Sequence, residues 1–192
     1  MRRPWVVFFS RTGTEIYKLC ERLRIYPDGI ISNKVNHTTT NANLIMLSAF
    51  RSHKLNSSLF WHQIPNNPSI EDYESVLKNY NNPVVTLHGY LRIVPEQICN
   101  KYEMYNLHPG NIKLYPSLKG KDPQKQAFQL QHTTVGCVLH RVVPEVDEGE
   151  IIYSQSTYND CETVDCVYEK CANIALDLWQ SFFNSYIKLE SK

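Results

Sequence analysis

The sequence has no long apolar run that would suit a membrane. Near its start the longest apolar run is Trp5-Val6-Val7-Phe8-Phe9, far short of the roughly 20 residues that a spanning helix needs. Arg2-Arg3 precedes this run, but the run is too short for a signal peptide and no small-residue cleavage site follows it. We therefore expect a buried first strand here and no membrane partner.

Net charge is also almost absent. A formal net charge of +1 gives no support for a nucleic-acid-binding face, which normally shows a basic patch. The chain has 192 residues, of which 42% are hydrophobic, and this composition is ordinary for a globular protein. The length suits one domain, which we expect to be a monomer or a homodimer.

No two cysteines form a Cys-x-x-Cys pair, so a structural zinc site is not expected. Cys161, Cys166 and Cys171 lie five residues apart, which is a poor spacing for a shared helical face. We predict that all six cysteines are free thiols in a reducing cytoplasm and that the protein binds no metal. Internal repeats and low-complexity tracts are absent as well.

Up to Lys101, strand patterns alternate with helical patterns. Strands are expected at residues 4–10, 29–32, 44–47 and 84–87, and helices at residues 15–24, 70–79 and 95–101. Residues 35–43 and 51–67 are expected to be irregular, and the role of region 36–67 stays open. The alternation predicts an α/β fold with a mostly parallel, Rossmann-like sheet and helices on both faces.

Beyond residue 102 the pattern changes. Residues 103–107 are expected to end a strand, and His108-Pro109-Gly110 is expected to be the loop leaving it. A short connection joins two further expected strands, which predicts an antiparallel C-terminal pair at residues 136–142 and 150–155. A short helix is expected at 123–130. A final helix at 164–188 has apolar positions at helical spacing, which should pack on the sheet.

The most informative stretch is Tyr105-Asn106-Leu107-His108-Pro109-Gly110, followed later by Val146-Asp147-Glu148-Gly149. Asn106 and His108 lie two residues apart, so an extended backbone places both side chains on one face. An amide and an imidazole can hold a developing oxyanion, and a carboxylate can steer a proton. These are the groups needed to move an acyl group onto an amine. Because ligands bind beyond the carboxyl ends of strands in open α/β sheets, Asn106, His108 and Asp147 are the predicted catalytic residues.

The Asn106-x-His108-Pro109 motif with a later Asp147 resembles the folate-dependent formyltransferases, and the overall length is closest to the glycinamide ribonucleotide formyltransferases. Other markers occur in the family order. They are a turn at Ser10-Arg11-Thr12-Gly13-Thr14-Glu15, the triplet Ser32-Asn33-Lys34, the loop Gly89-Tyr90-Leu91-Arg92-Ile93-Val94, and the strand Thr133–His140 that runs up to the catalytic Asp.

The resemblance implies that residues 1–192 form a single formyltransferase catalytic domain in the cytoplasm. Its formyl donor would be 10-formyltetrahydrofolate, and its acceptor a primary amine on a small molecule such as glycinamide ribonucleotide, a purine precursor. His108 would stabilise the oxyanion or shuttle its proton, and Asn106 would donate a hydrogen bond to the same oxygen. Asp147 would orient His108 or accept the amine proton through a water molecule.

The same resemblance assigns binding segments. Folate would lie against apolar side chains and backbone amides of Gly89, Tyr90, Leu91, Arg92, Ile93, Val94, Val143, Pro144, Glu145 and Val146. The acceptor would be bound by Arg11, Thr12, Gly13, Thr14, Glu15, Pro109 and Gly110. For Arg92, the alternative is an ordinary surface residue.

Several residues depart from the family pattern near the acceptor. Arg11 replaces a glycine, and Glu15 replaces the usual Asn with a carboxylate that repels phosphate at a helix start, an effect that Arg11 would offset. Gly110 stands where the ribonucleotide enzymes usually have Ser, and this His-Pro-Gly form is similar to the sugar-amine formyltransferases. Lys119 and Lys121 would either contact an anionic acceptor or belong to a solvated loop.

Four alternatives to the leading hypothesis are therefore considered. The His-Pro-Gly form favours a sugar-amine formyltransferase, but we expect no sugar-nucleotide accessory domain in this sequence. The intact set of Asn106, His108 and Asp147 argues against a non-catalytic folate-binding module. A generic nucleotide-binding domain predicts Gly-x-Gly-x-x-Gly after the first strand, which the sequence lacks. A methionyl-tRNA formyltransferase would carry a further basic C-terminal domain, for which we expect no room.

Overall fold

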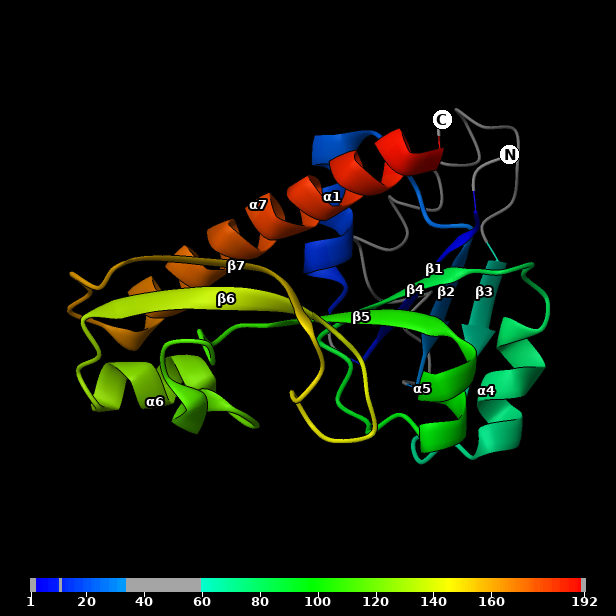
Figure 1. The fold of residues 1–192 in the computed structure, drawn as a ribbon, viewed down its shortest axis with the longest axis horizontal. Coiled ribbons are helices and arrows are strands. Elements are labelled where there is room, and N and C mark those ends of the chain that lie inside the picture. The colour runs from blue at the N-terminus through cyan, green and yellow to red at the C-terminus, as the bar shows by residue number, and fades with distance from the viewer. Residues whose placement is uncertain (1–2, 11, 34–59, 191–192) are drawn as a thin grey trace. The chain divides into compact units, whose positions relative to one another are not determined.

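The computed structural model describes residues 3–10, 12–33 and 60–190 (Figure 1). Three predictions lie outside these residues. They are the strand at 44–47, the irregular segment at 35–43 and the role of Arg11.

Seven strands form one mixed sheet with the hydrogen-bonded order β3-β2-β1-β4-β5-β6-β7. The strands are β1 (Trp5–Phe9), β2 (Gly29–Ser32), β3 (Phe60–Gln63), β4 (Val84–His88), β5 (Glu103–His108), β6 (Thr134–Arg141) and β7 (Ile151–Tyr158). Strand β1 pairs in parallel with β2 and β4, and β2 pairs in parallel with β3. Strand β6 is antiparallel to both β5 and β7. The predicted α/β class, mostly parallel with an antiparallel C-terminal pair, is confirmed.

Strand β3 corrects one expectation. Residues 51–67 were expected to be irregular, yet Phe60–Gln63 form a strand whose register pairs Gly29 with Phe60 and Ser32 with Gln63. The backbone amide of Ile64 continues the pairing by donating to the Ser32 carbonyl at 3.0 Å. Its residues Phe-Trp-His-Gln form neither a continuous apolar run nor an alternation of apolar and polar residues, so the pairing with β2 decides their conformation.

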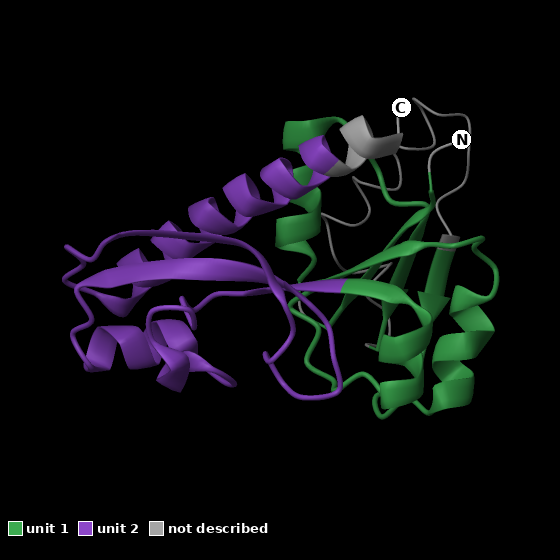
Figure 2. Ribbon diagram, in the orientation of Figure 1, with its two compact units in different colours: residues 1–104 green, residues 105–192 purple. Residues whose placement is uncertain are grey.

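The chain divides into two compact units, residues 1–104 and 105–192 (Figure 2). The first unit holds the parallel strands with helices α1 (Thr14–Leu23), α4 (Ile70–Leu77) and α5 (Glu96–Lys101). All five residues of β1 are buried, as the continuous apolar run predicted. Helix α4 begins with a capping box, because Ser69 accepts from the Asp72 amide while the Asp72 carboxylate accepts from the Ser69 amide.

The second unit holds β6, β7, the 3₁₀ turn η1 (Pro116–Leu118), and helices α6 (Pro123–Gln129) and α7 (Val164–Glu190). Helix α7 packs on β6. Its predicted apolar stripe is confirmed for the positions that are buried, namely Val167, Cys171, Ile174, Leu178 and Phe182. The ring of Phe182 also contacts Tyr105, with centroids 4.7 Å apart. No helix within the described ranges is both long and apolar enough to span a membrane.

Two cysteines correct the prediction of six free thiols. Cys161 and Cys166 form a disulfide, with their Cα atoms 5.6 Å apart, a separation that such bonds commonly span. Only Cys166 lies within α7, because Cys161 belongs to the turn before the helix. The helical spacing rule therefore did not apply to this pair. Cys20, Cys99, Cys137 and Cys171 are buried thiols, as predicted.

The disulfide should stabilise the entry into α7. Replacing Cys161 and Cys166 together by Ser is expected to lower the free energy of unfolding by about 2 kcal/mol, because a short loop is no longer closed in the unfolded chain. Urea unfolding of both proteins, with and without reductant, measures this. Reductant should bring the parent protein to the stability of the variant and leave the variant unchanged. Alkylation of Cys161 and Cys166 in the unreduced, denatured parent would contradict the disulfide.

Candidate active site

Strand β5 carries two of the predicted catalytic residues. It extends through His108, which was expected to lie in the following loop. Antiparallel pairing with β6 explains the extra residue, since Asn106 faces His140 and His108 faces Val138 in the register. The His108 side chain is buried, and Asn106 is half-buried.

His108 and Asp147 contact each other in the second unit. His108 Nδ1 lies 3.2 Å from Asp147 Oδ2, and the two side chains are only 5% and 8% exposed. Asp147 belongs to the connection between β6 and β7 and has a left-handed backbone, with φ 57°, which Asp tolerates better than most residues. The structure thus brings together Asn106, His108 and Asp147, the residues predicted to be catalytic.

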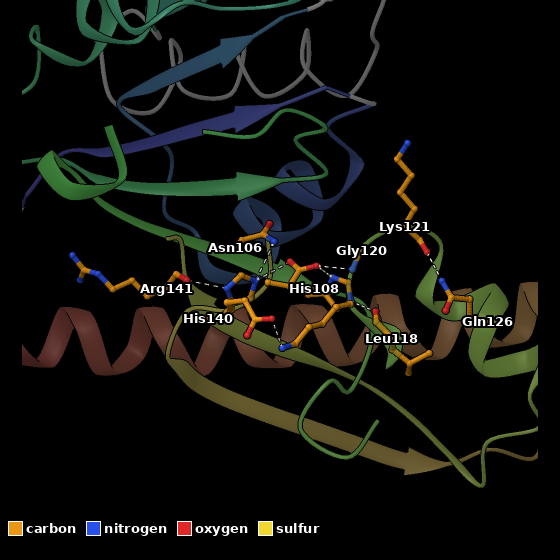
Figure 3. A network of polar contacts seen from close by, with 11 residues as sticks. Asn106, His108, Leu118, Gly120, Lys121, Gln126, His140 and Arg141 are labelled. Carbon is orange, nitrogen blue, oxygen red and sulfur yellow. Dashed lines mark hydrogen bonds and ion pairs between the residues drawn. The ribbon is translucent and has the colours of Figure 1, made fainter. Parts of the chain in front are cut away.

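A backbone carbonyl sets the hydrogen position on His108. His108 Nε2 lies 2.7 Å from the carbonyl oxygen of Leu118 (Figure 3). Because a carbonyl only accepts hydrogen bonds, Nε2 carries the hydrogen of the neutral ring. Burial lowers the pKa of His108 and outweighs the raising effects of Asp147 and the Leu118 carbonyl. Nδ1, which faces Asp147, is therefore the nitrogen that gains or loses a proton.

Asp147 is held as a carboxylate. Burial raises its pKa, but electrostatic interaction with His140 and His108 and the hydrogen bond from the Gly120 amide together bring the pKa below its usual value. The Gly120 amide donates to Asp147 Oδ2 at 2.9 Å. An anion in this position can receive a proton or stabilise a protonated His108.

His140 belongs to the same cluster and was not among the predicted site residues. Its Nδ1 donates to the Arg141 carbonyl at 2.9 Å, so Nε2 of the neutral ring is an acceptor. Nε2 lies 3.3 Å from Asn106 Nδ2 and 3.4 Å from Asp147 Oδ1. The available signal was a histidine in an otherwise apolar strand, Val-Gly-Cys-Val-Leu-His, and only the β5–β6 register shows its partners.

Gly110 packs against the edge of the His108 ring. A Cβ atom at Gly110 would lie 2.9 Å from His108 Nε2 and 2.7 Å from Pro123 Cβ. These separations are too short for a side chain without movement of one neighbour. The Gly in His-Pro-Gly therefore has a steric role beside His108.

The first unit holds the predicted binding segments 12–15 and 89–94, whereas the predicted folate segment 143–146 lies in the second unit. The loop after β1 and the loop after β4 are bonded to each other, because Ser10 Oγ accepts from the Leu91 amide at 3.0 Å and the Ser10 amide donates to the Gly89 carbonyl at 3.3 Å. Gly89 has φ 61°, a left-handed conformation that glycine adopts at no steric cost. The segments predicted for acceptor and for folate thus begin side by side in this unit.

Glu15 is held by a buried chain of polar groups. Trp5 Nε1 donates to Thr86 Oγ1 at 2.7 Å, and Thr86 Oγ1 lies 2.8 Å from His88 Nε2. Because the indole can only donate, the Thr86 hydroxyl is free to donate to Nε2. His88 Nδ1 then donates to Glu15 Oε1 at 2.6 Å. His88 therefore orients the Glu15 carboxylate in the first turn of α1. The sequence patterns did not identify this histidine.

The predicted folate loop has two faces. Tyr90 and Val94 are buried, whereas Leu91 and Ile93 are 53% and 72% exposed. The Arg92 guanidinium donates from Nε to the Asn66 carbonyl and from Nη2 to Asn66 Oδ1, both at 2.5 Å. Arg92 thus connects this loop to the segment after β3, and its role in the folate site stays a prediction.

The two lysines of the 114–124 segment differ from each other. Lys119 Nζ lies 2.6 Å from Glu148 Oε1, whereas Lys121 is exposed and its side chain is directed away from His108 and His140 (Figure 3).

No group of His, Cys, Asp and Glu side chains in the described part of the chain is arranged to hold a metal ion.

Comparisons with known proteins identify the family of this chain. The family model for formyl transferases matches residues 6–175. The chain therefore belongs to the formyl transferase family, as the Asn106-x-His108-Pro109 motif and its companion motifs predicted. The match spans both compact units.

Individual relatives are more distant. The chain is 27% identical to the human trifunctional purine biosynthetic protein adenosine-3 over 157 residues, which is 78% of this chain and only 15% of that protein. Its fold is similar to phosphoribosylglycinamide formyltransferase from Anaplasma phagocytophilum, with a TM-score of 0.75 and 23% identity over 92% of this chain and 82% of the other. It is also similar to a sugar N-formyltransferase from Shewanella, with a TM-score of 0.69 and 20% identity over 97% and 71%.

The close approach of Gly110 to His108 predicts a cost for any side chain. Gly110→Ala is expected to lower the free energy of unfolding by about 1–3 kcal/mol, because Pro123 cannot move as freely as a flexible side chain. Urea unfolding measures the change. Ser117→Ala is the matched control, since Ser117 is exposed in the same loop and should stay within about 0.5 kcal/mol of the parent. Equal stability of Gly110→Ala and the parent would contradict the steric role.

Proposed function

We propose that this protein is a 10-formyltetrahydrofolate-dependent N-formyltransferase that acts on a primary amine of a small acceptor. The observation that carries the proposal is the buried contact between His108 Nδ1 and the Asp147 carboxylate, with Asn106 and His140 completing the cluster. The two compact units would act as one catalytic domain, which the family match across both of them supports.

In this proposal the protein residues divide the work of acyl transfer. The folate, when bound, supplies the formyl carbon. Asn106 Nδ2 has two hydrogens, of which one is directed at His140 Nε2 and the other would bind the formyl oxygen. One such donor typically lowers the barrier by about 3–4 kcal/mol. His140 would therefore position Asn106 without touching the substrate.

The proton of the attacking amine would leave through His108 and Asp147. Nδ1 of the neutral His108 accepts the proton, with Asp147 stabilising the imidazolium that results. The Leu118 carbonyl keeps the other hydrogen on Nε2 throughout. In its protonated form, Nδ1 can donate to the oxyanion and can later return the proton to the leaving nitrogen.

Exposed apolar side chains support the folate segments. In the described part of the chain, the large apolar residues that are strongly exposed include Leu91, Ile93 and Val146. Each belongs to a segment predicted to bind folate. Exposed side chains of this kind suit the flat face of a pterin ring, and their burial by it would be favourable.

Glycinamide ribonucleotide is the first acceptor to test, and purine biosynthesis the corresponding role. The similarity to the purine protein and to phosphoribosylglycinamide formyltransferase supports it. A sugar-amine acceptor is the second, because Gly110 packs on His108 with no space for the usual Ser and a sugar N-formyltransferase shares the fold. Cytoplasmic location and a monomeric or dimeric state remain predictions. The Cys161–Cys166 disulfide argues against a cytoplasmic location, since disulfides are rare in the cytosol.

Formyl transfer to a panel of amines tests the proposed function. Tetrahydrofolate release is followed by absorbance with glycinamide ribonucleotide, amino-sugar nucleotides or no acceptor. His108→Ala is expected to reduce kcat/KM about 10²–10⁴-fold with the productive acceptor. Turnover without acceptor would indicate a hydrolase. Folate binding without turnover on any amine would favour a binding module, and loss of folate binding altogether would rule out the proposal.

The state of His108 predicts the pH dependence. Because burial lowers its pKa below the ordinary value of 6.5, the ring stays neutral from pH 8 down to that value and becomes protonated only at lower pH. We expect the protonation of His108 to leave kcat/KM unchanged above pH 6.5 and to lower kcat/KM below pH 6.5. The pH dependence of the residual activity of His108→Ala should reflect only the protonation of the acceptor amine. An inflection near pH 7 or above that disappears in His108→Ala would contradict this assignment.

A further inference from the structure

Three consecutive residues contact the His108–Asp147 pair and its neighbour. The Leu118 carbonyl accepts from His108 Nε2, and the Gly120 amide donates to Asp147 Oδ2. Between them, Lys119 reaches Glu148, the residue that follows Asp147. The segment 118–120 thus contacts the histidine, the aspartate and the turn on which the aspartate lies.

Gly120 lies just beyond η1, and neither Gly120 nor Asp147 belongs to a helix or strand. Gly120 has φ 88°, and Asp147 has φ 57°, so both backbones turn through left-handed conformations outside helices and strands. The Glu148 amide makes only a long bond, 3.4 Å, to the Glu145 carbonyl. The position of the Asp147 carboxylate therefore depends on contacts between residues 119–120 and 147–148. Among the described residues, the ion pair that joins these two loops is Lys119–Glu148.

We propose that the Lys119–Glu148 ion pair is a latch that positions the Gly120 amide on Asp147 and so sets the state of the catalytic pair. Lys119 and Glu148 are positioning residues in this inference, since neither touches the reacting atoms. Their role in catalysis rests on the proposed function. Their side chains are 34% and 52% exposed, so the latch is a weak one that solvent and salt can loosen.

Two ways in which these charges could act give different results. If the two charges act only through space, removing the Glu148 charge would lower the pKa values of Asp147 and His108, and removing the Lys119 charge would raise both. If the two residues act as a latch, removing either charge frees the Gly120 amide. Asp147 then loses a donor and becomes a stronger partner for protonated His108, so both variants raise the pKa values. Glu148→Gln is therefore the variant that separates the two mechanisms.

The groups that face this pair are known from the structure. His140 Nε2 lies near Asp147 Oδ1, and the Leu118 carbonyl and Gly120 amide complete the contacts. None of these groups is chemically changed by Glu148→Gln or Lys119→Met. The direction in which Glu148→Gln moves the pH profile therefore reports on the latch.

The first measurement needs no substrate. Amide hydrogen exchange of Gly120 is followed by NMR in the parent, Glu148→Gln, Lys119→Met and the charge-reversed double variant K119E/E148K. We expect exchange about threefold faster in each single variant, in line with a weak exposed ion pair, and restored protection in the double variant. Lys125→Met and Glu169→Gln, which alter exposed charges on α6 and α7, are matched controls that should leave Gly120 unchanged.

The second measurement is the pH profile of formyl transfer. Both single variants should lose about threefold in kcat/KM, and their acidic limbs should move to higher pH, with recovery in the double variant. An acidic limb that moves to lower pH in Glu148→Gln, or unchanged Gly120 exchange in both single variants, would overturn the latch. If the parent transfers formyl to no amine while Gly120 exchange responds as expected, the proposed function fails and the geometric latch stands.

Discussion

Burying a carboxylate against two imidazole rings removes water from groups that water solvates strongly, and this cost is recovered only when each polar atom finds a partner. The cluster around Asp147 meets that requirement in part. Its carboxylate accepts from the Gly120 amide and lies beside His108 and His140, while each neutral ring donates its one hydrogen to a backbone carbonyl. Protonation of His108 at Nδ1 would supply Asp147 with a further donor.

The partners come from elements that are far apart in the sequence. Strand β5 supplies Asn106 and His108, strand β6 supplies His140 opposite Asn106, and two irregular loops supply Gly120 and Asp147. The β5–β6 register places the side chains with the precision of a sheet, whereas the loops rely on left-handed residues and on the Lys119–Glu148 pair. Chemistry that requires a rigid imidazole and an adjustable carboxylate is consistent with this division.

In the first unit, a second polar chain plays a comparable structural part. The chain from Trp5 through Thr86 and His88 to Glu15 orients a carboxylate at the start of α1, next to the loop that begins at Gly89. A carboxylate here is unfavourable for a phosphate, which is one physical reason to test acceptors other than a ribonucleotide. The exposed Leu91 and Ile93 on the neighbouring loop are suited to an apolar ring.

The sequence by itself determined the alternation of strands and helices, the buried first strand, the apolar stripe of α7 and the family, because periodicity and short motifs are local properties. It also placed Asn106, His108 and Asp147 in one functional set. It did not predict β3, whose residues Phe-Trp-His-Gln show neither an apolar run nor an alternation, or the Cys161–Cys166 disulfide, which depends on where α7 begins. Only the tertiary structure decided that His140 joins the site, that Leu118 sets the hydrogen position on His108 and that Lys119 pairs with Glu148. Each of these contacts depends on strand register or on a loop conformation, which local sequence patterns do not specify.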